Sequence, residues 1–71
     1  GSMPAVLNAA NEIAVSAFLA GDLRFIDISS LIAIVMEQAD TVQLNSLEDV
    51  LAIDRDARAV ATTILQEKFL N

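Results

Sequence analysis

PAVLNAANEIAVSAFLAG, residues 4–21, is the stretch of this chain that decides its fold. Pro4 stands where a first helical position tolerates a missing N–H. The alanines, leucines and glutamate that follow have high helix propensity. Gly21 supplies the positive φ that commonly ends a helix. We therefore predict a helix over residues 4–20.

The surface of this first helix is mostly apolar. Twelve of the sixteen residues from 5 to 20 are apolar. The polar ones fall on one narrow stripe and are Asn8, Asn11, Glu12 and Ser16. A helix with so little polar surface requires burial on most sides, so we predict that it lies at the centre of the domain.

A short connector follows the first helix. Alternation of apolar and polar residues predicts a brief extended piece over residues 22–26, in which Phe25 plugs one end of the core. Asp27 is placed to cap a second helix over residues 28–39. The apolar stripe of that helix consists of Ile28, Leu31, Ile32, Val35 and Ala39. Ile34 and Met36 lie off its centre, which leaves this helix with excess apolar surface.

A polar loop over residues 40–45, anchored by Val42 and Leu44, leads to the third helix. Ser46-Leu47-Glu48-Asp49 matches a capping box, with Asp49 in the place usually held by Glu or Gln. The helix is predicted over residues 46–69. Its expected core face consists of Leu47, Val50, Leu51, Ala57, Val60, Ala61, Ile64 and Leu65.

Asp54 falls on the core face of the third helix, and two explanations compete. It could start a second helical segment as an N-cap, with a bend at Ile53. Alternatively, it pairs with Arg58 one turn later within a continuous helix. We favour a continuous or slightly bent helix.

Composition excludes several classes of protein. The formal net charge of −6 disfavours binding to nucleic acids and to anionic membranes. No segment reaches the roughly 20 apolar residues of a membrane span. The chain has no cysteine and no histidine, which removes disulfides, an ordinary zinc site, a Cys nucleophile and a His base. Lys68 lies near a helix end, where a cation is favoured, and has no apolar pocket to make it a catalytic amine.

Three groups of polar residues have both a functional and a structural interpretation. Glu48 and Asp49 are adjacent, and Asp54 and Asp56 flank Arg55. Such carboxylate pairs could do acid–base work or hold a cation, but here the members of each pair point in different directions around a helix. We interpret them as a helix N-terminus and a solvated face. Asn8, Asn11 and Glu12 could contact a ligand. We favour a structural role, in which they satisfy the backbone of the connector or dock a neighbouring domain.

Ser46 has a second possible reading. Asn45-Ser46-Leu47 is similar to the Asp-Ser-Leu attachment site of acyl carrier proteins, which are also short, helical and acidic. The Asp is an Asn here, however, and only one helix follows the serine. We therefore favour Ser46 as a plain helix cap.

A longer pattern runs through nearly all of the chain after residue 3. Leu-Asn-Ala-Ala-Asn-Glu at 7–12 is followed by Arg-Phe-x-Asp-Ile at 24–28. The pattern also includes Pro4-Ala5-Val6, Ala14-Val15, Ala17-Phe18-Leu19, Asp49-Val50-Leu51, Asp54 and Ala57-Arg58. This order resembles the C-terminal helical domain of the 1-deoxy-D-xylulose 5-phosphate reductoisomerase family.

The resemblance implies a parent enzyme of the non-mevalonate (methylerythritol phosphate) isoprenoid pathway. Such enzymes convert 1-deoxy-D-xylulose 5-phosphate to 2-C-methyl-D-erythritol 4-phosphate. They are homodimers that use NADPH and a divalent metal, Mg or Mn. The cofactor binds an N-terminal Rossmann-like domain, and metal and substrate bind a central domain. A bacterial cytoplasm or a plastid stroma is the expected location.

None of that chemistry is expected in these 71 residues. They contain no Gly-x-Gly-x-x-Gly, no acidic metal cluster and no basic phosphate pocket, so we assign no catalytic, cofactor-binding or metal-binding residue. Residues 1–3 are interpreted as a cloning remnant. Residues 4–71 are expected to be an all-α, three-helix part of the family's four-helix bundle, which braces the central catalytic domain, starting after its first helix.

A missing helix would leave an apolar patch exposed, and such patches mark interaction sites. We therefore expect the fragment to complete its bundle by self-association, as a two-fold dimer. Two alternatives remain from other classes of protein. One is an autonomous helical protein-interaction module, and the other is an acyl-carrier-like domain with Ser46 as its attachment site.

Overall fold

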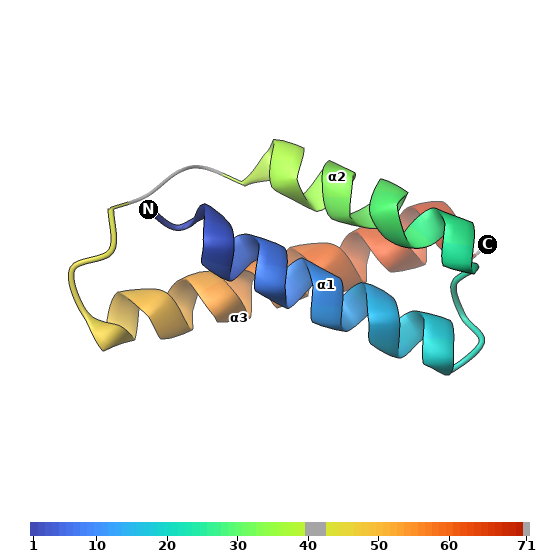
Figure 1. The fold of residues 1–71 in the computed structure, drawn as a ribbon, viewed down its shortest axis with the longest axis horizontal. Helices are drawn as coiled ribbons and strands as arrows, with labels where there is room; N and C mark the ends of the chain where they lie inside the picture. The colour runs from blue at the N-terminus through green and yellow to red at the C-terminus, as the bar shows by residue number, and fades with distance from the viewer. Residues whose placement is uncertain (40–42, 71) are drawn as a thin grey trace.

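Three long helices make up the fold, as the computed structural model shows (Figure 1). The structure describes residues 1–39 and 43–70. The long helices are α1 (Met3–Leu19), α2 (Ile28–Gln38) and α3 (Leu47–Ile64). A short 3-10 helix, η1 (Phe25–Asp27), leads into α2, and a π-helical segment, η2 (Leu65–Phe69), continues α3. Within the described residues there is no strand, so the prediction of an all-α, three-helix fold is confirmed.

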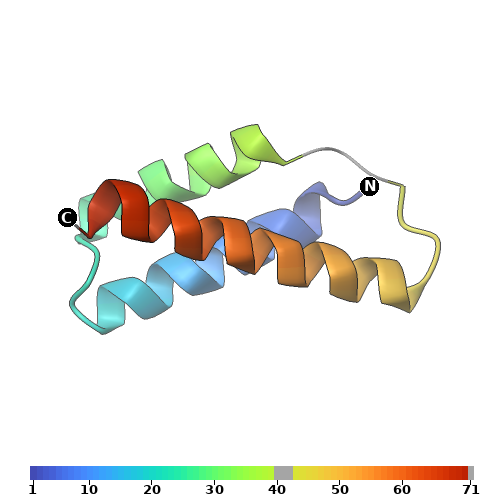
Figure 2. The ribbon, with the colours of Figure 1, turned by 180° about the vertical axis from the view of Figure 1, so that it is seen from behind.

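Helix α1 packs against both other helices. The three lie roughly along one direction, and α2 and α3 diverge toward the N-terminal half of α3 (Figures 1 and 2). Alanine makes the close packing of α1 possible, because Ala9, Ala10 and Ala14 are fully buried. The core consists of Val6, Ala9, Ala10, Ala14, Ala17, Leu23, Leu31, Val35, Ala57, Ala61, Ile64 and Leu65.

The first helix ends in a Schellman motif at Gly21, whose φ is +83°. The Gly21 N–H donates to the Phe18 carbonyl at 3.1 Å, and the Asp22 N–H donates to the Ala17 carbonyl at 2.8 Å. Both bonds satisfy carbonyls that the helix itself leaves without a donor. The predicted role of Gly21 is therefore confirmed.

The connector after α1 corrects three predictions. Residues 22–26 do not form an extended piece, because bends at residues 22 and 23 lead to the η1 turn, which begins at Phe25. Phe25 does not plug the core, since it is 71% exposed, and Leu23 fills that position at 5% exposure. Asp27 occupies the N-cap position of α2 without making a side-chain cap. The η1 turn runs directly into α2, so Asp27 has helical rather than extended backbone angles. Its carboxylate instead accepts a hydrogen bond from Arg24 Nε at 2.9 Å.

The start of α3 is a capping box, as predicted. Ser46 Oγ accepts the Asp49 N–H at 3.2 Å. The Asp49 carboxylate accepts the N–H of Asn45, the residue before the cap, at 3.0 Å, where a standard capping box uses the N–H of the cap residue itself. The helix then continues past Asp54 without a second N-cap, so the alternative of a new segment there is wrong. Of the predicted loop, Val42 lies outside the described residues.

The predicted core face of α3 is correct only in part. Ala57, Ala61, Ile64 and Leu65 are buried, whereas Leu47 is 72% exposed and Leu51 is 59% exposed. The first turns of α3 extend beyond the start of α1, so none of the described helices covers them (Figure 1). Two large apolar side chains therefore remain in solvent where a further element could pack.

The first residues of the chain belong to the folded part. Ser2 is buried, its carbonyl accepts the Val6 N–H at 3.1 Å, and Met3 begins α1. The interpretation of residues 1–3 as a cloning remnant stays a prediction. In the described part of the chain, no helix is long and apolar enough to cross a bilayer.

Candidate functional site

Glu12 joins α1 to α3 through an ion pair. Arg58 Nη2 donates to the Glu12 carboxylate, and Arg58 Nε donates to Asp54 Oδ2 at 2.7 Å. Hydrogen bonds to Asp54 and then to Glu12 raise the pKa of Arg58 above its ordinary value. The guanidinium thus stays charged and holds two carboxylates from different helices. This confirms the predicted Asp54–Arg58 pair.

Asn8 and Asn11 are exposed on the outside of α1. In the described part of the chain, neither asparagine side chain has a hydrogen bond, and Glu12 binds Arg58 rather than the backbone of the connector. The prediction that these three polar residues satisfy the connector is therefore wrong. Docking of a neighbouring element is the remaining structural interpretation for the two amides.

Three carboxylates of α3 are engaged in local structure. Asp49 belongs to the capping box, Asp54 pairs with Arg58, and Asp56 lies 3.5 Å from Arg55 with both side chains exposed. Among residues 1–39 and 43–70, no group of three or more acidic, His or Cys side chains could hold a metal ion. These residues therefore do not fit the metal that the family resemblance implies, and no chemical step is derived through it.

Ser46 is occupied as a helix cap, since its Oγ accepts a backbone hydrogen bond from Asp49. This hydroxyl satisfies one of the free N–H groups at the start of α3. Lys68 lies in the last turn of η2, where a cation interacts favourably with the helix dipole, as predicted. Ser46 thus stabilises the start of α3, and Lys68 the end of η2.

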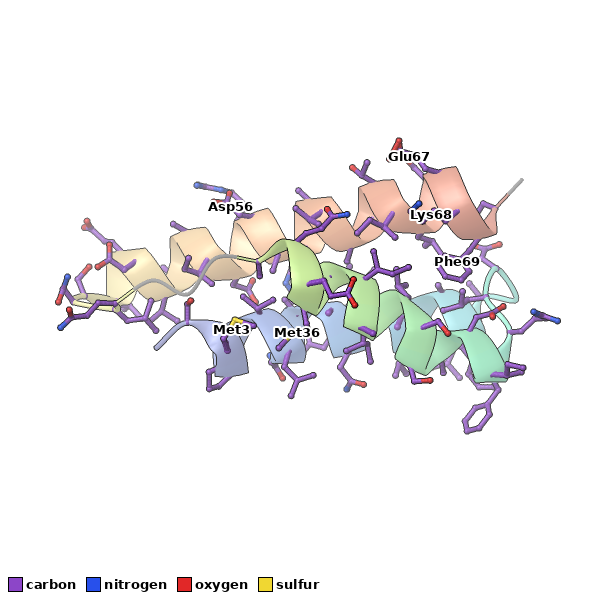
Figure 3. The ribbon with its side chains drawn as sticks, turned by 90° about the horizontal axis from the view of Figure 1, so that it is seen from above. Met3, Met36, Asp56, Glu67, Lys68 and Phe69 are labelled. Atoms are coloured by element: carbon purple, nitrogen blue, oxygen red, sulfur yellow. The ribbon has the colours of Figure 1, made fainter. Side chains whose placement is uncertain are left out.

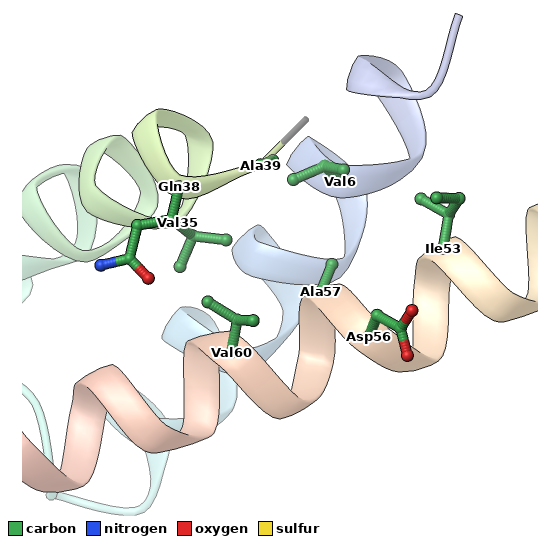
Figure 4. Close-up of a pocket in the computed structure, with 8 residues that line it drawn as sticks. All are labelled: Val6, Val35, Gln38, Ala39, Ile53, Asp56, Ala57 and Val60. Atoms are coloured by element: carbon green, nitrogen blue, oxygen red, sulfur yellow. The ribbon is translucent and has the colours of Figure 1, made fainter. Parts of the chain in front are cut away.

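An apolar groove lies where α2 and α3 diverge. Its cavity of about 260 Å³ is mostly lined by aliphatic side chains, with Val6 of α1 and Ala57 of α3 among them (Figure 4). The lining residues are Val6, Val35, Gln38, Ala39, Ile53, Asp56, Ala57 and Val60. Gln38 and Val60 also line a second depression. Its other lining residues include Glu67 and Lys68, which are labelled in Figure 3. We call this surface the α2–α3 groove.

The groove and the first turns of α3 have the character of a docking surface. Apolar lining with few polar side chains is typical of sites that receive another apolar element. Leu47 and Leu51 lie on the same helix as Ile53, at the diverging end of the bundle. The described residues therefore define a small all-helical domain that carries an apolar surface.

The chain belongs to the family described as the DXP reductoisomerase C-terminal domain, whose model matches residues 1–60. It is 56% identical over 61 residues to a 1-deoxy-D-xylulose 5-phosphate reductoisomerase of Nitrosomonas eutropha, covering 86% of this chain and 15% of that protein. The enzyme of Symbiobacterium thermophilum is also 56% identical over 61 residues, covering 86% of this chain and 16% of the relative. The enzyme of Cupriavidus pinatubonensis is 51% identical over 67 residues, covering 94% of this chain and 17% of the relative.

The predicted family resemblance is thereby confirmed. The chain spans 15–17% of the length of these relatives. The sequence pattern at residues 7–12 and 24–28 is what indicates membership of this family. The α2–α3 groove gave no such signal, because it is formed by residues far apart in sequence.

Proposed function

We propose that this chain serves as a structural domain of a 1-deoxy-D-xylulose 5-phosphate reductoisomerase and carries none of the reacting groups. The observation that supports this most is the state of its polar side chains. Arg58, Asp54 and Glu12 form one bridge, and Ser46 and Asp49 form a helix cap. Beside exposed polar side chains such as Asn8 and Asn11, the chain presents an apolar groove and exposed leucines, which are suited to packing against other parts of an enzyme.

The parent enzyme would carry out the reaction for which its relatives are named. It would use NADPH and a divalent Mg or Mn held by other domains, within a bacterial cytoplasm or a plastid stroma. The central catalytic domain of the same parent chain is the proposed partner. Acidic net charge is consistent with an intrachain role rather than with binding to nucleic acid.

The proposal is tested with a chimeric enzyme. The matching segment of the Nitrosomonas eutropha reductoisomerase is replaced by this chain, and NADPH oxidation is measured with 1-deoxy-D-xylulose 5-phosphate. The chimera should retain activity within about tenfold of the parent, since packing surfaces tolerate similar side chains. Deletion of the segment should abolish it.

The isolated chain provides the complementary measurement. Under the same conditions with Mg²⁺, it should oxidise no NADPH above the rate of buffer. Sustained turnover by the isolated chain would contradict the proposal, and so would full activity of the enzyme that lacks the segment.

A further inference from the structure

Asn45 lies where its side chain can react with its own backbone. It is exposed, it lies outside any helix, and the exposed Ser46 follows it. An asparagine loses ammonia when the backbone nitrogen of the next residue attacks its side-chain amide carbon. A small next residue such as serine leaves room for this attack. The position of Asn45 therefore favours spontaneous deamidation.

The capping box of α3 leaves the attacking nitrogen without a hydrogen bond. In a standard capping box, the side chain at the third helical position accepts the N–H of the cap residue. Here the Asp49 carboxylate accepts the Asn45 N–H at 3.0 Å instead. Among the described residues, the Ser46 N–H donates to no acceptor, whereas the Ser46 hydroxyl and carbonyl accept the N–H groups of Asp49 and Val50. The nitrogen that has to attack is thus the one that this capping box does not hold.

The other two asparagines in the described part of the chain lie within a helix. Asn8 and Asn11 belong to α1, and the N–H groups of the residues that follow them take part in the hydrogen bonds of that helix. Attack at either position requires the helix to open locally first. Both side chains are as exposed to solvent as that of Asn45, so the backbone is what distinguishes the three positions.

We propose that Asn45 is a site of spontaneous deamidation. The Ser46 nitrogen forms a bond to Asn45 Cγ and gives up its proton, and the side-chain nitrogen leaves as ammonia. The five-membered succinimide that results is opened by water at either of its two carbonyl carbons. One opening yields aspartate, and the other yields isoaspartate, in which the backbone runs through the former side chain. Overall, one water enters and one ammonia leaves.

Both products disturb the start of α3. The new carboxylate lies beside that of Asp49, which the hydrogen bond to the Asn45 N–H holds close, so like charges repel. Isoaspartate also lengthens the backbone directly before Ser46, which moves the cap oxygen away from the Asp49 N–H. Loss of this cap loosens the first turns of α3, which carry Leu47 and Leu51. The effect on packing against an enzyme rests on the proposed function, whereas the reaction itself does not.

The rates at the three asparagines provide the first test. The chain is incubated in mildly alkaline buffer and digested, mass spectrometry follows each amide, and isoaspartyl methyltransferase labels the isoaspartate. Asn45 should convert at least about tenfold faster than Asn8 or Asn11, because α1 must open before either of them reacts. In urea this ratio should fall, since the backbone of α1 is then free. Similar rates in the folded chain, or an equally large ratio in urea, would overturn the proposal.

Asp49→Glu tests the role of the capping box. The longer side chain reaches the Ser46 N–H, as in a standard box, and should slow the conversion of Asn45 by about fivefold, roughly the effect of one hydrogen bond. Glu48→Asp is the matched control, since it changes the length of a neighbouring exposed carboxylate outside the box and should leave the rate unchanged. Circular dichroism checks that both variants keep their helices. Equal rates in Asp49→Glu and the natural chain would contradict the proposal.

The aged chain tests the effect on α3. After conversion of most of the Asn45, its Tm should lie a few degrees below that of an Asn45→Gln variant incubated in the same way, because the cap is weakened. Glutamine is the control because its longer side chain does not readily form the five-membered ring. Equal Tm values would overturn the effect on α3. None of these measurements depends on enzyme activity, so their outcome is separate from that of the chimeric enzyme.

Discussion

Arg58 is a single residue that links two helices, α1 and α3, through its side chain. It reaches Glu12 from 46 positions away and Asp54 from one turn away. The second contact follows from helix geometry, and sequence spacing was enough to suggest it. The first depends on how α1 and α3 pack, and no local pattern in the sequence indicates it.

Replacement of Arg58 by Met should lower the Tm of the chain by a few degrees. It removes the cation that joins α1 to α3 and leaves the Glu12 and Asp54 carboxylates near each other without a counter-charge. Arg55→Met is the control, since the Arg55–Asp56 pair is exposed and local. Thermal unfolding followed by circular dichroism measures both. Equal Tm values for the two variants would contradict the role given to Arg58.

The pH dependence of the bridge follows from the direction of the Arg58 shift. Its pKa is raised in the folded state, so its stabilising contribution is fully present below the pKa of the unfolded chain. The contribution is lost only in strongly alkaline solution. The difference in Tm between the Arg58→Met variant and the natural chain should therefore stay constant from neutral pH to about pH 10.

Among the helices, the features that could be predicted from the sequence are the helix ends set by local chemistry. Gly21 ends α1 and Ser46 starts α3, because positive φ and a cap oxygen act within a few residues. Asp27 does not cap α2 as its position predicts, because η1 runs directly into α2 and gives the residue helical backbone angles. Whether the backbone before α2 is extended or forms a 3-10 turn depends on how the connector packs over Leu23.

Ala14 tests the close packing of α1. It is fully buried in a core that α1 lines largely with alanine, so Ala14→Leu should lower the free energy of unfolding by about 1–3 kcal/mol through overpacking. Ala33→Leu is the matched control on the exposed side of α2 and should have little effect. Urea unfolding measures both. A neutral Ala14→Leu would mean that α1 is not tightly held between its neighbours.

At the scale of the whole molecule, the errors of sequence-based prediction share a cause. Three large apolar residues have the spacing typical of core residues, yet their side chains lie in solvent: Leu47, Leu51 and Phe25. A hydrophobic pattern shows that a side chain is made for burial, but not which chain buries it. The α2–α3 groove likewise arises from the divergence of two helices, and helical periodicity does not specify how helices diverge.

In the proposed function, this chain acts by packing its apolar surfaces against the rest of an enzyme. The most direct test introduces Leu47→Asp together with Leu51→Asp, first in the isolated chain and then in the chimeric reductoisomerase. Both leucines are largely exposed, so the isolated chain should keep its Tm within a few degrees, as should the control Ala33→Asp. In the chimera, the double variant should lower Tm and NADPH oxidation while Ala33→Asp leaves both unchanged. A double variant as stable and as active as the unmodified chimera would contradict the claim.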